Sequence, residues 1–180
     1  MKEKFEKTHW HKQRQRYIKK WALGKIIELG CGNIPCFEHS VKTDIRKFKG
    51  YILFDLNFSF PLKEKFDTVI ATEVIEHLWN VDNFLNECYS ILNKNGIFIL
   101  STPNIKYWKN RIDLLFGKTT IFDEDEYKKS SGFVGHLRFY TPQKFCGLLK
   151  KYSFRVEEVK PIGRIRFINF CPDFIVKARK

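Results

Sequence analysis

The chain has 180 residues, of which 43% are hydrophobic and 29% charged, a composition typical of one globular domain with its own core. Its net charge of +13 is concentrated at the two ends, because residues 1–20 carry eight Lys or Arg against two Glu, and residues 160–180 carry six against one Asp. Such ends suit an anionic lipid surface or nucleic acid, and solubility alone accounts for them equally well. The five cysteines include no C-x-x-C pair, which excludes a zinc site of that type and favours a reducing cytoplasm over a disulfide framework. We expect neither a signal peptide nor a membrane span.

Residues 3–22 have the spacing of an amphipathic helix, with Trp10, Tyr17, Ile18 and Trp21 near one face and basic residues on the others. The aromatic stripe predicts a helix that packs on the domain, and a helix lying on a membrane surface is the alternative. We take residues 1–180 as a single domain with a basic N-terminal helix over 1–22.

A short apolar run, Ile26-Ile27, is followed by Glu28 and by the turn Gly30-Cys31-Gly32. Glycine allows positive φ and lets a ligand approach the backbone closely. Ligands of open α/β sheets bind at the carboxyl ends of strands, so this turn is a candidate binding site. Tight loops of this composition also occur without a ligand.

Two further short strands also end in an acid, Val41–Asp44 and Tyr51–Phe54 with Asp55 behind it. Asp44 follows the first strand at about the spacing at which a carboxylate holds a ribose diol in nucleotide-binding folds. A fourth strand, 66–71, runs into Thr72 and Glu73. These segments together favour a nucleotide-type ligand.

The remaining elements alternate between helix and strand. In chain order we expect a helix capped by Asp82 and stopped at Asn95-Gly96, a strand over 97–100, a helix starting at Thr141-Pro142, and strands over 154–159 and 174–178. The pattern predicts a Rossmann-like α/β fold: a doubly wound, mostly parallel seven-stranded sheet with helices on both faces and an antiparallel C-terminal edge hairpin.

Six segments in this order resemble class I S-adenosylmethionine-dependent methyltransferases, and the small branch similar to ubiquinone-pathway O-methyltransferases in particular. They are ELGCGN at 28–33, TDI at 43–45, FDLN at 54–57, FDTVIATEVIEHL at 66–78, LNKNGIFILSTPN at 92–104 and GHLRFYT at 135–141. The resemblance implies S-adenosyl-L-methionine as cofactor.

The same resemblance implies the cofactor-binding residues, each at the position that matches the family's motif. Glu28 would face the methionine ammonium, and the backbone of Gly30, Cys31 and Gly32 would contact the methionine and the ribose. Asp44 would bind the ribose hydroxyls, and Asp55 with the amide of Leu56 would bind the adenine edge. Thr72 and Glu73 would close the site on the methionine side. The chain departs from the family at Ile34-Pro35, where a third glycine is usual, and the helix that normally follows is shortened or missing.

The candidate catalytic residues are His77, Glu73 and His136, because an imidazole titrates near neutral pH and can accept the acceptor's proton. On a helical turn Glu73, Glu76 and His77 would share a face, and the resemblance allows a divalent metal there. Most methyltransferases with similar residues bind none, so we favour a site without metal.

Residues 104–140 are expected to form a substrate cap, and its aromatic and basic residues suit an apolar, anionic or lipid-linked acceptor. The D/N-P-P-Y/F tetrapeptide of amino-methylating nucleic-acid enzymes and the nucleophilic Cys of base-carbon methylation are both missing after the fourth strand. We therefore predict a cytoplasmic enzyme that methylates an oxygen of a small or lipid-linked molecule, with peripheral contact to the inner membrane face through its basic ends. The alternatives are an RNA methyltransferase, or a nucleic-acid-binding protein with a degenerate methyltransferase core.

Overall fold

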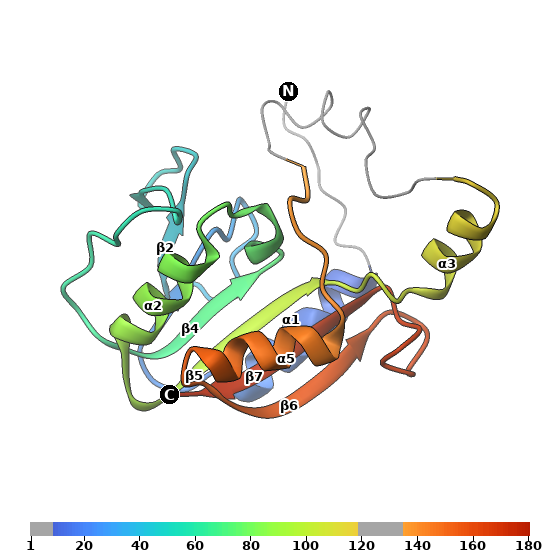
Figure 1. The fold of residues 1–180 in the computed structure, drawn as a ribbon. Coiled ribbons are helices and arrows are strands. Elements are labelled where there is room, and N and C mark those ends of the chain that lie inside the picture. The colour runs from blue at the N-terminus through green and yellow to red at the C-terminus, as the bar shows by residue number, and fades with distance from the viewer. Residues whose placement is uncertain (1–8, 119–134) are drawn as a thin grey trace.

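The computed structural model describes residues 9–118 and 135–180, and a seven-stranded sheet is its centre (Figure 1). The strand order is β3-β2-β1-β4-β5-β7-β6, and only β7 runs against its neighbours, as an antiparallel partner of both β5 and β6. The strands are β1 (Ile26–Glu28), β2 (Val41–Asp44), β3 (Ile52–Leu53), β4 (Phe66–Thr72), β5 (Leu92–Pro103), β6 (Arg155–Ile162) and β7 (Asp173–Arg179). The predicted doubly wound sheet with a C-terminal hairpin is confirmed.

Helices lie on both faces of the sheet, as Figure 1 shows. They are α1 (His9–Trp21), the 3-10 helix η1 (Ile75–His77), α2 (Val81–Ile91), α3 (Trp108–Leu115) and α5 (Pro142–Lys151). The side chains of β5 alternate between the two layers, as a pleated strand requires. Ile97 and Ile99 pack in one cluster with Ile18 of α1, whereas Phe98 and Leu100 join the larger cluster that contains the buried faces of α2 and α5.

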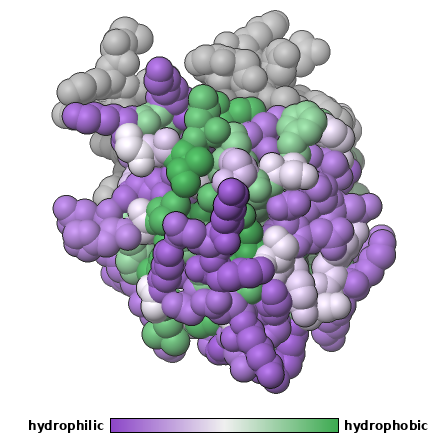
Figure 2. Space-filling view, turned by 90° about the vertical axis from the view of Figure 1, so that its left-hand side faces the viewer, coloured by the Kyte–Doolittle hydropathy of each residue, from purple (hydrophilic) through white to green (hydrophobic). Residues whose placement is uncertain are grey.

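The connections on either side of β2 contain no helix. Residues 29–40 and 45–51 form turns and bends, which confirms that the helix usual after the glycine turn is missing. Ile45, Ile52 and Leu53 are exposed at the β3 edge of the sheet as a result. Figure 2 shows the side of the molecule that carries this edge, where a hydrophobic band runs between hydrophilic surroundings.

Both expected limits of α2 are wrong. The N-cap is Asn80, whose side chain accepts the N–H of Asn83, while the carboxylate of Asp82 accepts the hydroxyl of Tyr152. The helix ends at Ile91, and the next residue already belongs to β5.

The start of α5 agrees with the sequence prediction, since Thr141 caps the helix by accepting the N–H of Lys144 at 3.2 Å, and Pro142 occupies its first turn. Of the N-terminal helix and the cap expected over 104–140, residues 1–8 and 119–134 lie outside the described residues. Within the described residues, no helix is both long enough and apolar enough to cross a membrane.

Candidate active site

The three strands that end in acids are neighbours in the sheet and run parallel, so their carboxyl ends meet at one edge. Between β1 and β2, Gly30 and Gly32 adopt positive φ values of 61° and 58°. A Cβ at Gly30 would lie 2.9 Å from Cγ2 of Val74, a contact that a real Cβ does not make. The turn therefore needs glycine both for its backbone conformation and for its packing.

Glu28, expected to face the cofactor's ammonium group, is only 2% exposed and holds the following loop. Its Oε2 accepts the N–H of Cys36 at 2.6 Å, and its Oε1 accepts the N–H of Phe37 at 3.0 Å and the hydroxyl of Ser40 at 2.5 Å. Two of these bonds satisfy backbone donors of a loop that contains no helix. In this structure Glu28 thus positions the loop beside the glycine turn.

Asp44 lies beside the glycine turn, where the ribose of the cofactor is expected. Its Oδ2 accepts the N–H of Gly32 at 2.8 Å, and its Oδ1 accepts both the backbone N–H and the Nε of Arg46, at 2.9 and 3.1 Å. The Asp44 side chain is 4% exposed and that of Arg46 is 51% exposed. The guanidinium therefore covers the carboxylate from the solvent side and would have to move before a diol could bind it.

Asp55 and Leu56, expected at the adenine, lie in the loop after β3. Oδ1 of Asp55 accepts the backbone N–H and the side-chain Nδ2 of Asn57, both at 2.9 Å. Oδ1 of Asn57 accepts the backbone N–H groups of Trp79 and Asn80, at 2.9 and 3.1 Å. These bonds fix the loop to the start of α2, and Leu56 beside it is buried.

The cysteines beside the glycine turn are not nucleophiles. Burial raises the pKa of Cys31 to about 11 and that of Cys36 to about 12, and the charge of Glu28 adds to both shifts. Each is a thiol at neutral pH, which makes it a weak nucleophile.

Arg14 of α1 contacts two acids at the carboxyl edge of the sheet, which we call the ligand edge. The sequence analysis did not predict this contact. Nη2 of Arg14 lies 3.1 Å from Oε1 of Glu73, just after β4, and 3.1 Å from Oδ2 of Asp173 at the start of β7. Burial raises the pKa of Asp173 to about 7, with the charge of Glu73 as the second cause, and Arg14 opposes the shift. The sequence signal was the position of Arg14 four residues after Trp10 and four before Ile18, within the apolar stripe.

Glu73 does not lie on a helical turn with Glu76 and His77, so that expectation is wrong. Its φ is +55° and it precedes η1, and its Oε1 accepts the hydroxyl of Ser101 at 2.6 Å. Thr72, expected beside it at the methionine side, ends β4 and is partly exposed.

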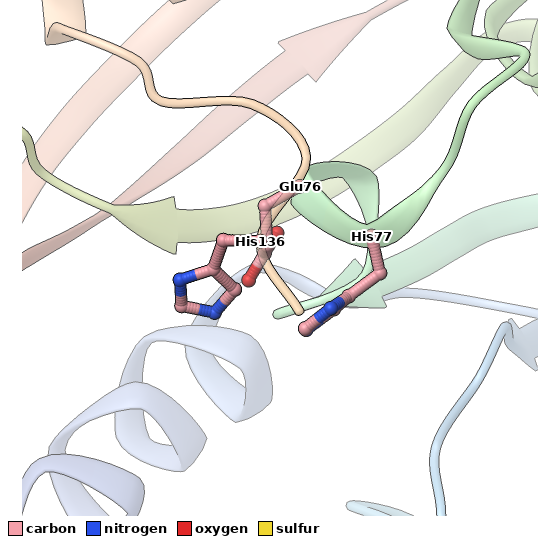
Figure 3. A group of neighbouring side chains, drawn as sticks. All are labelled: Glu76, His77 and His136. Atoms are coloured by element: carbon pink, nitrogen blue, oxygen red, sulfur yellow. The ribbon is translucent and has the colours of Figure 1, made fainter. Parts of the chain in front are cut away.

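Glu76, His77 and His136 form a cluster instead, shown in Figure 3. One donor atom of each lies within 4.8 Å of the others, and the imidazole rings are 4.9 Å apart between centroids. The main chain brings His136 there, because the carbonyl of Glu76 accepts the N–H groups of Leu137 and Arg138, at 2.8 and 3.3 Å.

Glu76 is almost fully buried, and burial raises its pKa well above the usual value, with the charge of Glu73 as the next cause. Its Oε2 accepts the hydroxyl of Thr102 at 3.2 Å, and its Oε1 has no hydrogen-bond partner among the described residues. A buried carboxylate oxygen beside two imidazoles fits either a shared proton or a divalent cation of borderline hardness.

The comparisons with known proteins place the chain in a family. A family model described as a methyltransferase domain matches residues 4–159, so the chain belongs to the methyltransferase domain family. A probable S-adenosylmethionine-dependent methyltransferase of Mycolicibacterium smegmatis is 47% identical over 121 residues, covering 55% of this chain and 47% of the relative. A ubiquinone biosynthesis O-methyltransferase of Pelagibacter ubique is 40% identical over 101 residues, 44% of this chain and 42% of the relative.

A crystal structure of an S-adenosylmethionine-dependent methyltransferase from Mesorhizobium loti superposes with a TM-score of 0.69 at 14% identity, covering 96% of this chain and 98% of that one. The predicted class, a class I S-adenosylmethionine-dependent methyltransferase with a Rossmann-like fold, is thus confirmed at the level of family and fold. The chain spans less than half the length of the curated relatives named above.

Proposed function

We propose that this chain binds S-adenosylmethionine at the carboxyl edge of β1, β2 and β4 and transfers its methyl group to an oxygen of a small apolar or lipid-linked acceptor. The observation that supports this proposal most directly is that one residue, Val74, contacts both the glycine turn and the segment that holds His77. The side chain of Val74 packs against Gly30, and its carbonyl accepts the N–H of His77 at 3.0 Å. Val74 therefore connects the proposed cofactor site with the candidate base.

The acids at this edge suit the cationic cofactor. Asp44 would bind the ribose once Arg46 has moved, and Asp55 would bind the adenine edge. Glu73 lies beside Asp173 at this edge, and its carboxylate would attract the methionine ammonium and the sulfonium. The positioning of these groups is the protein's contribution, because the cofactor itself supplies the reactive methyl.

Methyl transfer is an in-line displacement. The acceptor oxygen forms a bond to the methyl carbon while the carbon–sulfur bond breaks and its electron pair stays on the sulfur. The hydroxyl proton of the acceptor passes to His77 or His136, whose rings lie 4.9 Å apart between centroids. A divalent cation, where one binds, would be held by Glu76, His77 and His136 and would lower the pKa of the acceptor hydroxyl.

We propose residues 104–140 as the acceptor-binding part of the single domain. A thiolate-dependent reaction on a nucleic-acid base is disfavoured by the raised pKa values of Cys31 and Cys36. The partial similarity to ubiquinone O-methyltransferases supports an oxygen acceptor.

Cofactor binding is tested by calorimetric titration of S-adenosylmethionine. Asp44→Asn should weaken binding about 10- to 100-fold, the value of a hydrogen bond to a charged group, and the exposed Glu38→Gln should leave it unchanged. No binding to the unmodified chain, together with salt-sensitive retention on RNA, would instead support the nucleic-acid-binding alternative.

Catalysis is tested by incubating the protein and labelled cofactor with a lipid extract and measuring product mass. His77→Asn and His136→Asn should lower the rate at least about 100-fold, as expected for loss of a general base, with unchanged cofactor affinity. The exposed His39→Asn is the matched control. Full activity in both histidine variants would refute their assigned role.

A further inference from the structure

The surface formed by α3 and the loop between β6 and β7 is apolar, basic and not used by the cofactor site. We call it the α3 surface and define it as residues 106–118 and 163–172. None of the residues of α3 is buried, although an amphipathic helix of a globular domain ordinarily buries one face. In Figure 1 this helix and the loop lie at the same end of the molecule, away from β2.

Its apolar side chains are unusually exposed. Leu115 is 83% exposed and Phe116 77%, and Phe167 in the opposite loop is 75% exposed. Single exposed apolar residues need no explanation, but a group of large ones marks a binding surface.

The two halves of this surface are held together. The guanidinium of Arg111 lies 5.0 Å from the ring centroid of Phe170, and its Nη2 donates to the carbonyl of Asn169 at 3.1 Å. Lys106 donates to the side chain of the same Asn169 at 3.4 Å. Between the halves is a cleft of about 640 Å³, lined by Trp108, Arg164, Ile165, Arg166, Phe167 and Phe170.

The charge of the α3 surface is strongly positive. Its two segments contain six basic residues and one acidic residue, Asp113; the basic residues are Lys106, Lys109, Arg111, Lys118, Arg164 and Arg166. Basic side chains around exposed Leu, Phe and Trp are the pattern of proteins that insert apolar groups between anionic headgroups. A protein partner of ordinary composition would not require this charge.

We propose that the α3 surface docks this protein on an anionic lipid bilayer, with Phe116 and Phe167 inserted at the level of the headgroups. The docking itself does not depend on the proposed function. Its role does, because docking would bring a lipid-linked acceptor to the ligand edge. The geometry fits that purpose, because Asn104, at the end of β5, fixes the loop by donating to the carbonyls of Ile168 and Cys171 at 2.9 and 3.0 Å. The α3 surface thus lies at the carboxyl end of β5, the end of the parallel strands that also carries the proposed active site.

The test is co-sedimentation of the full chain with vesicles of phosphatidylcholine alone and with about 30% phosphatidylglycerol. The unmodified chain should bind the anionic vesicles at least about 10-fold more tightly than the neutral ones. Arg164→Gln with Arg166→Gln should lower the partition coefficient at least about 10-fold, since each basic residue near an anionic surface contributes roughly a factor of five. Phe116→Ser with Phe167→Ser should abolish binding that persists at about 1 M salt, where screening removes the electrostatic part.

Matched controls come from the opposite end of the sheet. Lys47→Gln with Lys49→Gln removes the same charge from the loop between β2 and β3, and Leu53→Ser removes an exposed apolar side chain from β3. Neither should change vesicle binding more than about twofold. Equal losses in controls and test variants, or no binding to anionic vesicles, would overturn the proposal.

Two other outcomes would assign the surface to a different partner and also overturn the proposal. One is a dimer in sedimentation velocity that Phe116→Ser with Phe167→Ser dissociates. The other is RNA binding that requires Arg164 and Arg166 but not the two Phe residues. Cofactor titration on the same preparations separates the two proposals, because an unmodified chain that binds S-adenosylmethionine but not anionic vesicles refutes the docking surface alone.

Discussion

Replacing Asp173 with Asn should stabilise the protein increasingly as the pH rises from about 4 to about 7. The pKa of Asp173 is raised by burial from 3.8 to about 7, so the folded state holds this proton over a range in which the unfolded state has lost it. The unfolded state then binds fewer protons, and the free energy of unfolding falls with rising pH. Asn cannot ionise, so the Asp173→Asn variant escapes this loss.

The size of the effect follows from the shift. One pKa unit corresponds to about 1.4 kcal/mol, which gives an upper limit of about 4 kcal/mol for the change from 3.8 to about 7. Glu73 shares the guanidinium of Arg14 with Asp173, and in the variant that ion pair is no longer contested. Because Glu73 bears part of the electrostatic cost of sharing Arg14, we expect Asp173→Asn to raise the free energy of unfolding near pH 7 by about 2 kcal/mol, less than this limit.

The assay is urea unfolding followed by tryptophan fluorescence at several pH values between 4 and 8. The quantity compared is the difference in free energy of unfolding between Asp173→Asn and the unmodified chain, with the exposed Glu38→Gln as control. A difference that is flat with pH would refute the reasoning, and so would one that grows toward acid, because that would mean that Arg14 stabilises the ionised carboxylate more than burial destabilises it.

Two further predictions concern the glycine turn. Arg46→Ala should tighten S-adenosylmethionine binding about two- to fivefold in calorimetry, because it removes an ion pair worth up to about 1 kcal/mol that competes for the carboxylate of Asp44. Lys47→Ala is the control. Weaker binding in Arg46→Ala would mean that the guanidinium contacts the cofactor. Gly30→Ala should lower the free energy of unfolding by at least about 1–2 kcal/mol, since a Cβ there meets Val74 at positive φ, whereas Gly147→Ala, with open space in α5, should raise it by about 0.5–1 kcal/mol. Equal effects of the two alanine variants in urea unfolding would contradict this reading of the turn.

The parts of the fold that were predictable from sequence are those that depend on neighbouring residues. The apolar run over 97–100 and the Thr141-Pro142 start were sufficient, because a short apolar run after a turn and a helix cap are local signals. The end of α2 was not, because Leu92 pairs with Phe66 in the sheet and therefore leaves the helix before Asn95. A pairing across 26 residues overrides a local helix stop.

The sequence predicted which residues stand at the strand ends of the candidate site, but not which side chains contact one another there. Sequence order gave the acids and the glycine turn, since parallel strands place their ends together. It did not give Arg14, whose partners lie 59 and 159 residues away in the chain, nor the pairing of His77 with His136. Polar contacts of this range have no periodic signal, and an Arg within an apolar helical stripe is the kind of local anomaly that reveals one.

The absence of a helix on either side of β2 explains why the acids at the ligand edge are already engaged. Glu28 holds the amides of Cys36 and Phe37, and Asp44 holds Gly32 and Arg46, so carboxylates that the family resemblance assigns to the cofactor also maintain loops that no helix supports. A ligand can displace the half-exposed guanidinium of Arg46 at small cost, because its side chain returns to water. It cannot displace the backbone amides without leaving buried donors unsatisfied. We therefore infer that the cofactor competes with the guanidinium of Arg46 for Asp44, while the backbone N–H bonds of Asp44 and Glu28 stay in place.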